Sequence, residues 1–460
     1  MTKTDTAPPP VLDASSRRLA NILTIGAVLP LLDATIITVA LDRIADDLHM
    51  SLSLAQWAVT GYALAAALAI PLSGWMSARF GAKNLWITAL VIFMIGSLLA
   101  GAAWNPAALI VFRVVQGIGG GLLMPALQTV LVSAVGPSLV KPAMAKVGIP
   151  AVLAPIFGPV VGGLLVEWLN WRWTLLINLP ICLIAIWLAF RYITDPVVRQ
   201  PVRLDWLGLL LALPGVALVV FGLDRFGVDS ASGYYLAAGL VLLAAYTAHA
   251  LTTRKMPLLD VRLFAVKNFT GAIGVLLTAS MIFYAGILLV PLYFQQARGL
   301  TPLQAGLIVG IQGVGALVAR RIGTPLTHRI STRTLVAISI TLAGIGTVPF
   351  AWQVFSEHGA LLYLALFLRG AGIGLVTILA MGAAYDGMAK AQIPHASSAS
   401  RLTTQVGASL GAVAVVSILH SASTGHSLVS AYHETFLWLL IGTALCLVPT
   451  VLLGRTVPSK

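Results

Sequence analysis

The chain has 460 residues, of which 58% are hydrophobic and only 9% are charged, and its mean hydropathy is +0.95. Soluble domains carry about 25% charged residues, so this composition excludes a soluble globular protein and indicates a polytopic membrane protein. The net charge of +13 does not indicate nucleic-acid binding, because the Lys and Arg residues lie in short segments between apolar runs.

Apolar runs long enough to cross the hydrocarbon core, about 20 residues each, follow one another along the chain. Charges and prolines separate these runs, so the sequence predicts an all-α polytopic membrane protein with fourteen transmembrane helices. The predicted spans are residues 19–41, 55–77, 85–103, 107–134, 142–166, 173–192, 205–223, 233–251, 269–296, 302–320, 334–353, 360–384, 396–420 and 433–453.

The basic residues indicate which side the connections face. Most of the 28 Lys and Arg residues fall in the two tails and in alternate connections between spans, including Arg79, Lys83, Arg320 and Arg401. Positive charge resists translocation across the membrane. We therefore expect both termini to be cytoplasmic, and the polar tail 1–18 shows no secretory signal pattern.

Two stretches of the chain resemble each other, which predicts an internal repeat. Residues 109–124, LIVFRVVQGIGGGLLM, align with residues 365–378, ALFLRGAGIGLVTI, and Gln116 then falls on Arg369. Transporters are often built from repeated halves with the substrate site between them. We expect two pseudo-symmetric six-helix bundles plus an inserted helix pair. The expected divisions are a cytoplasmic tail at 1–18, spans 1–6 at 19–192, a linker with spans 7 and 8 at 193–268, spans 9–14 at 269–453, and a cytoplasmic tail at 454–460.

Asp33 is the acidic residue that stands inside an apolar span, in VLPLLDATIITVAL at residues 28–41. A charge at mid-membrane costs at least ~2.5–3.5 kcal/mol on insertion scales, so such residues usually face a cavity and mark an ion or proton path. We interpret Asp33 as a carboxyl that binds a proton or contacts substrate. The alternative is a structural carboxylate that Arg113 or backbone donors hold permanently.

Arg113 and Arg369 are the cations predicted to lie in mid-span, and Gln116 follows Arg113 by one helical turn. Arg113 could pair with Asp33 or order water for proton movement. The alternative for either arginine is that its guanidinium extends to the membrane interface.

The fifth predicted span contains GIPAVLAPIFGPVVGG at residues 148–163. Its prolines remove backbone donors and its glycines allow a neighbouring helix to approach closely. This pattern favours a bent helix that seals against its neighbours, although ordinary glycine packing would also explain it. The residues concerned are Gly148, Pro155, Gly158, Pro159, Gly162 and Gly163.

Other polar and aromatic residues of the spans are candidates for a substrate cavity. They are Thr35, Gln56, Trp57, Tyr62, Gln128, Tyr284, Gln312 and Arg369. The chain has no P-loop motif and no soluble segment long enough for a catalytic domain. We therefore expect no enzyme activity, no cofactor and no metal, and energy from an ion gradient or from the gradient of the substrate.

Together these motifs resemble the major facilitator superfamily, in particular its fourteen-span drug:proton antiporter branch, over nearly the whole chain. GWMSARFGAK resembles the loop motif after span 2, and RVVQGIGGG resembles the span 4 motif associated with proton transfer. GIPAVLAPIFGPVVGG resembles the span 5 antiporter motif, and L-D-x-T resembles the span 1 motif. Ala78 stands where the loop motif often has an Asp that helps to latch the two halves. The matching loop residues are Gly74, Arg79, Gly81 and Lys83.

The resemblance implies a proton-coupled antiporter of a bacterial cytoplasmic (inner) membrane, which exports amphipathic or cationic small molecules by alternating access. Asp33, Arg113 and Gln116 would then couple transport to protons. The expected partners are a small-molecule substrate, protons and the lipid bilayer, without nucleic acid, and the protein is expected to be a monomer. The alternatives are a proton-coupled uptake symporter for a nutrient such as a peptide, and a membrane sensor that does not transport.

Overall fold

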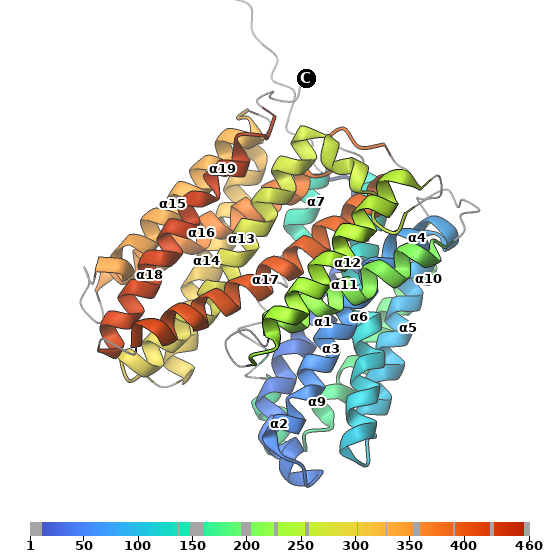
Figure 1. Cartoon of the computed structure of the whole chain (residues 1–460), viewed down its shortest axis with the longest axis horizontal. Coiled ribbons are helices and arrows are strands. Elements are labelled where there is room, and N and C mark those ends of the chain that lie inside the picture. The colour runs from blue at the N-terminus through green and yellow to red at the C-terminus, as the bar shows by residue number, and fades with distance from the viewer. Residues whose placement is uncertain are drawn as a thin grey trace, which may run out of the picture.

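The structure is a computed structural model, and every regular element in the part of the chain that it describes is a helix (Figure 1). The described residues are 12–135, 139–147, 158, 161–194, 204–224, 229–253, 257–300, 302–327, 329–352, 359–389, 392–423 and 427–454. The expectation of an all-α protein is confirmed for these ranges.

The helices fall into three consecutive sets along the chain. The first set comprises α1 (Ala14–Asp47), α2 (Leu52–Ala55), α3 (Trp57–Ala69), α4 (Leu72–Phe80), α5 (Ala82–Gly101), α6 (Pro106–Val135), α7 (Val140–Val147), α9 (Trp173–Leu176) and α10 (Asn178–Tyr192). The second set is α11 (Trp206–Asp224) and α12 (Ser232–Thr252). The third set comprises α13 (Lys267–Leu292), α14 (Pro302–Leu326), α15 (Thr332–Trp352), α16 (Ala360–Ala383), α17 (Ile393–Ser423), α18 (Leu428–Leu445) and α19 (Leu447–Thr450), with short helical turns at Val261–Ala265 and Tyr293–Ala297.

Twelve helices of the described part are long and apolar enough to cross a membrane. The predicted second span corresponds to α3 and α4, which meet at a bend of 54° beside Pro71 and would make a thirteenth. The predicted fifth span, 142–166, falls mostly outside the described residues. The structure therefore supports twelve or thirteen spans, and the number fourteen stays a prediction.

The first and third sets repeat the same helix packing. In the first set α6 packs against α3 and α5, and α1 packs against α6, α7 and α10. In the third set α16 packs against α14 and α15, and α13 packs against α16, α17 and α18. Figure 1 shows the two sets as separate groups, blue to cyan and yellow to red.

Glycines fix the close contacts of this repeat. A Cβ at Gly117 would overlap the backbone oxygen of Tyr62 on α3, and a Cβ at Gly370 would overlap that of Gln312 on α14. These two glycines are the pair that the sequence alignment places together, so the alignment of residues 109–124 with 365–378 describes a real structural correspondence. Gln116 and Arg369 therefore occupy equivalent positions on α6 and α16.

The two groups meet through a few helices. The helix α17 packs against α4 and α6 of the first group, and α7 packs against α14 and α16 of the third. The pair α11 and α12 packs together, and α11 also contacts α3 and α17. Large apolar side chains such as Trp187, Leu210 and Val241 are exposed on the outer surface, as expected for helices that face lipid.

Candidate functional site

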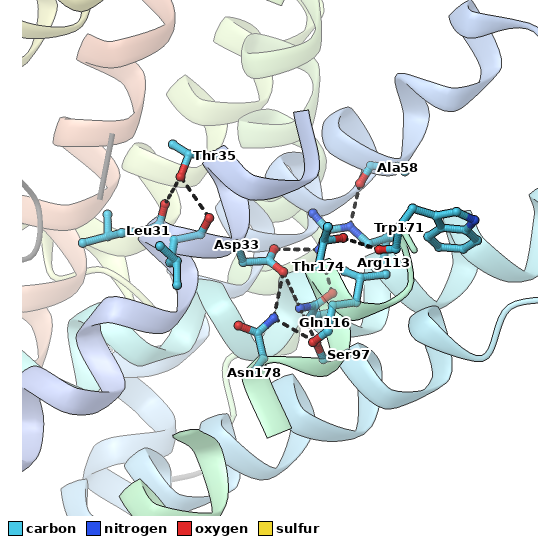
Figure 2. Close-up of polar contacts among 12 residues, drawn as sticks. Leu31, Asp33, Thr35, Ala58, Ser97, Arg113, Gln116, Trp171, Thr174 and Asn178 are labelled. Carbon is cyan, nitrogen blue, oxygen red and sulfur yellow. Dashed lines mark hydrogen bonds and ion pairs between the residues drawn. The ribbon is translucent and has the colours of Figure 1, made fainter. Parts of the chain in front are cut away.

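A buried polar network surrounds Asp33 in the first helix group (Figure 2). Arg113 on α6 donates from Nη1 to Asp33 Oδ2 at 2.6 Å, and both side chains are at most 1% exposed. Gln116 Nε2 donates to the other carboxylate oxygen, Oδ1, at 2.9 Å. Asn178 Nδ2 on α10 donates to the same oxygen at 3.0 Å. The carboxylate is thus held by one cation and two amides from two neighbouring helices.

Ser97 on α5 links the two amides. Its Oγ accepts hydrogen bonds from Gln116 Nε2 and from Asn178 Nδ2, each at 3.0 Å, and donates to the Leu175 carbonyl at 2.8 Å. The backbone of α5 can approach this point because residue 96 is glycine: a Cβ there would lie 2.5 Å from the Cα of Gln116. The network therefore depends on close packing between α5 and α6.

Arg113 has further partners around its guanidinium. Its Nε donates to the Ala58 carbonyl at 2.9 Å and its Nη1 also donates to Gln116 Oε1 at 2.7 Å. The Tyr62 ring lies against it, with its centroid 4.4 Å from Cζ, in a cation–π contact. Among the described residues Arg113 Nη2 has no hydrogen-bond partner. The contacts of Nε, Nη1 and the guanidinium face thus hold Arg113 beside Asp33 in the interior of the first helix group.

Asp33, Arg113 and Gln116 were selected from the sequence as candidate site residues, and the structure places them in contact. It also adds Ser97 and Asn178, which sequence reasoning did not select. Both are small polar residues inside apolar runs, which was a usable signal.

A cavity of about 230 Å³ lies between the two helix groups and is separate from this network. Four of the predicted cavity residues line it, namely Gln128, Tyr284, Gln312 and Arg369, whereas the other four do not. Its remaining lining is mostly apolar and comes from α1, α6, α7, α13, α14, α16 and α17: Leu31, Met124, Leu127, Met144, Val147, Leu276, Ser280, Phe283, Ile287, Val309, Gly313, Ala316, Arg320, Gly370, Ile373, Gly374, Thr377, Ile378, Met381, Arg401 and Thr404.

The four predicted residues outside the cavity have other surroundings. Thr35 Oγ1 donates to the Leu32 carbonyl of its own helix at 2.9 Å, and Gln56 is exposed before α3. Trp57 stacks on Phe221 of α11 at 6.4 Å between ring centroids, and Tyr62 covers Arg113.

Two cavity arginines were expected in cytoplasmic connections. Helix α14 continues to Leu326 and α17 begins at Ile393, so Arg320 and Arg401 both lie within helices and line the cavity. Arg320 is 9% exposed and its Nε donates to the Gly374 carbonyl at 3.2 Å. These two charges were counted with the connections although they stand at the end of span 302–320 and inside span 396–420, and the structure places both within helices.

The described glycines of the predicted antiporter motif pack against α1. A Cβ at Gly158 would overlap Thr35 Oγ1, and one at Gly162 would lie 3.1 Å from the Ile36 carbonyl oxygen. Gly163 has open space around it. Gly148, Pro155 and Pro159 lie outside the described residues.

The loop-motif segment lies where α4 meets α17. A Cβ at Gly74 would stand 3.3 Å from Ser398 Oγ, and the preceding residue, Ser73, shares a 2.7 Å hydrogen bond with the same hydroxyl. Gly81 ends α4 at φ +90°, a conformation that favours glycine. Lys83 Nζ donates to the Phe190 carbonyl at 3.2 Å, and Arg79 is exposed.

At the far end of α1, outside the apolar span, Asp47 forms an exposed counterpart to Asp33. It accepts hydrogen bonds from Trp171 Nε1 at 2.9 Å and from Arg172 Nη1 at 2.7 Å. The indole hydrogen bond and the neighbouring guanidinium lower the pKa of Asp47 from its ordinary value of 3.8. With 48% of its side chain exposed, water screens this pair strongly.

Comparison with known proteins gives a consistent result. The family model described as Major Facilitator Superfamily matches residues 23–412. The chain is 34% identical over 426 residues to "Multidrug resistance protein B homolog" of Mycobacterium tuberculosis, covering 91% of this chain and 79% of that protein. It is 31% identical to "Probable transport protein HsrA" of Haemophilus influenzae, covering 92% of each.

Solved structures show the same fold at low sequence identity. The human organic anion transporter MFSD10 (TETRAN) aligns over 97% of this chain and 100% of that chain, with a TM-score of 0.63 and 17% identity. The proton:xylose symporter XylE aligns over 95% of each chain with a TM-score of 0.62 and 17% identity. The chain belongs to the Major Facilitator Superfamily, and it is a multi-pass membrane transporter and not an enzyme.

Proposed function

We propose that this protein is a proton-coupled antiporter that exports amphipathic small molecules across a bacterial cytoplasmic membrane, with both termini cytoplasmic and without a cofactor. The observation that carries the proposal is the buried Asp33–Arg113 ion pair, which joins α1 to α6 inside the apolar spans. The names of the relatives, among them the multidrug resistance protein B homolog, support export of drug-like molecules.

The coupling step follows from the electrostatics of the pair. When a proton binds the Asp33 carboxylate, the negative charge disappears and the Arg113 charge loses its counter-ion in a water-poor environment. Leaving one partner of a buried pair uncompensated costs about 3–5 kcal/mol. Protonation therefore favours a different arrangement of α1 and α6, in which Arg113 reaches water or another partner.

The same two helices reach the cavity, which connects the proton site to the substrate site. Leu31 lines the cavity from α1, close to Asp33 in the sequence. Met124, Leu127 and Gln128 line it from α6, about two to three helical turns beyond Gln116. A shift between α1 and α6 would change the cavity wall. Because binding free energies are reciprocal, a substrate that stabilises one arrangement must weaken proton binding in it.

The glycines of the fifth predicted span support such a movement. Gly158 and Gly162 bring their helix directly against Thr35 and Ile36 of α1. Thr35 and Ile36 follow Asp33 closely in the sequence. Their tight contact with the glycines would keep the proton site closed toward the cavity during a movement of α1.

The test is transport in everted membrane vesicles that carry the full chain and are energised to an acidic interior. We expect fluorescent amphiphiles to accumulate in the vesicles and to leave when an ionophore collapses the pH gradient. The Asp33→Asn variant should lose this gradient-driven uptake at equal protein levels. Asp47→Asn, which removes an exposed carboxylate from the same helix, should retain it.

Three outcomes would overturn the proposal. Movement of the probe in the same direction as the proton would favour uptake by symport. Gradient-driven transport that persists in Asp33→Asn would remove Asp33 from the coupling step. Binding without net movement of any probe would favour a sensor.

A further inference from the structure

We propose that the cavity between the two helix groups selects amphipathic organic anions, and that Arg369 is the residue that contacts the anionic group. This inference rests on the proposed transport function for its context, but it concerns a different site from the Asp33 network. It assigns amphipathic anions where the sequence predicts amphipathic or cationic small molecules.

The charged residues of the cavity wall all have the same sign. Arg320, Arg369 and Arg401 line it, and the described lining contains neither Asp nor Glu. Asp33 is not part of the lining, so it offers no negative charge to a cationic substrate there. A cavity with three cations in a low-dielectric setting strongly favours an anion over a cation.

Arg369 is the arginine whose environment most needs a counter-ion. It is 1% exposed, and its Nη1 donates to Gln312 Oε1 at 2.6 Å. Its Nε and Nη2 have no hydrogen-bond partner in the described part of the chain. Both nitrogens are buried and Nη2 packs against Gly286 of α13, so the guanidinium must turn toward the cavity before a carboxylate binds this edge through both of its oxygens.

The buried arginine of the first helix group has different surroundings. There the equivalent position on α6 is Gln116, and the nearby Arg113 is neutralised by Asp33. In the third group α13 presents Gly286 to the arginine: a Cβ at that position would overlap the Arg369 guanidinium. The helix thus leaves room for the cation but provides no acid, and a buried cation without an acid is expensive unless a ligand pairs with it.

The rest of the wall suits an apolar body attached to the anionic group. Phe283, Ile287, Met124 and Met381 line the cavity, and unbranched methionines adapt to ligands of different shape. A volume of about 230 Å³ exceeds what an inorganic ion requires. The chemistry therefore favours a lipophilic carboxylate or sulfonate over a free phosphate.

The experiment compares three probes with one apolar body that carries a carboxylate, a carboxamide or an ammonium group. Binding to the purified full-length protein in nanodiscs is measured by titration calorimetry at a pH where the carboxylate is ionised. We expect the carboxylate to bind at least about tenfold more tightly than the other two. Arg369→Gln should remove this preference and Arg369→Lys should restore part of it, whereas Arg298→Gln, outside the cavity, should preserve it.

The outcomes separate this inference from the proposed function. Equal or tighter binding of the ammonium probe, or an unchanged carboxylate preference in Arg369→Gln, would overturn the inference. If the anion preference fails in this way but the carboxamide probe is still transported under a pH gradient, the antiport proposal stands without the anion inference. Inorganic phosphate that competes at the same concentration as the carboxylate probe would also contradict a site built for an amphipathic anion.

Discussion

The two helix groups have the same helix packing, but the surroundings of their buried arginines differ. On the α6 side, Arg113 is paired with Asp33 and surrounded by Gln116, Asn178 and Ser97. On the α16 side, Arg369 donates a side-chain hydrogen bond to Gln312 and lines a cavity whose described wall contains no acid. The first arrangement pairs the buried cation with an acid, which suits a switch driven by one proton. The second is open and unsatisfied, which suits a ligand.

The largest expected effect comes from breaking the closed pair. Arg113→Gln leaves the Asp33 carboxylate buried without its cation, which costs about 3–5 kcal/mol when one partner is removed. We expect a clear fall in the apparent melting temperature in detergent and loss of gradient-driven transport. The double variant Arg113→Gln with Asp33→Asn should recover much of the stability but not the transport. Wild-type stability in the single variant would contradict a tightly coupled pair.

The equivalent change in the open half should behave in the opposite way. Arg369→Gln removes a buried charge that lacks an acid, so its free energy of unfolding should stay within about 1 kcal/mol of the wild type or rise. Thermal unfolding of both variants side by side measures the difference directly. A loss as large as that of Arg113→Gln would mean that Arg369 has a structural counter-ion.

A smaller effect is expected from placing a methyl group against the Arg369 guanidinium. The Cβ of Gly286→Ala would overlap the Arg369 guanidinium, so the side chain must move and the affinity for the carboxylate probe should fall. In an Arg369→Gln background the same alanine should have little further effect, since the clash is gone. Gly306→Ala on α14, where a Cβ meets nothing within 4 Å, is the matched control. An undiminished affinity in Gly286→Ala would place the anion elsewhere.

The smallest effect is expected at the exposed carboxylate. The pKa of Asp47 lies below its ordinary value of 3.8 because Trp171 and Arg172 donate to the ionised form. Its contribution to stability is therefore present above the ordinary pKa and is lost as the pH falls through the lowered value of the folded state. Asp47→Asn should be slightly less stable than the wild type near neutral pH, with the difference shrinking in acid. A growing difference in acid would contradict this sign.

Several features of the fold and the site could be predicted because the membrane makes them conspicuous. Long apolar runs gave most of the helices, and a lone carboxylate in such a run identified Asp33. The glycine spacing around Gly117 and Gly370 gave the repeat, since close helix contacts need glycine at fixed intervals.

Other features depend on information that a single sequence does not carry. In helices that are apolar on all sides, periodicity does not say which face meets the cavity, so Gln128 and Gln312 could not be separated from Gln56 or Thr35. Arg320 and Arg401 were assigned to connections because charge normally marks a helix end. Ser97 was overlooked because a small hydroxyl inside a helix usually bonds its own backbone.

The most direct test of the account separates the two arginine sites in one reconstituted system. Proteoliposomes with Asp33→Asn or Arg369→Gln are assayed for carboxylate-probe binding and for transport of the carboxamide probe driven by a pH gradient. We expect Asp33→Asn to keep the binding and lose the driven transport, and Arg369→Gln to lose the binding and keep the driven transport. Loss of both properties in both well-folded variants would contradict the division of proton and substrate between the two helix groups.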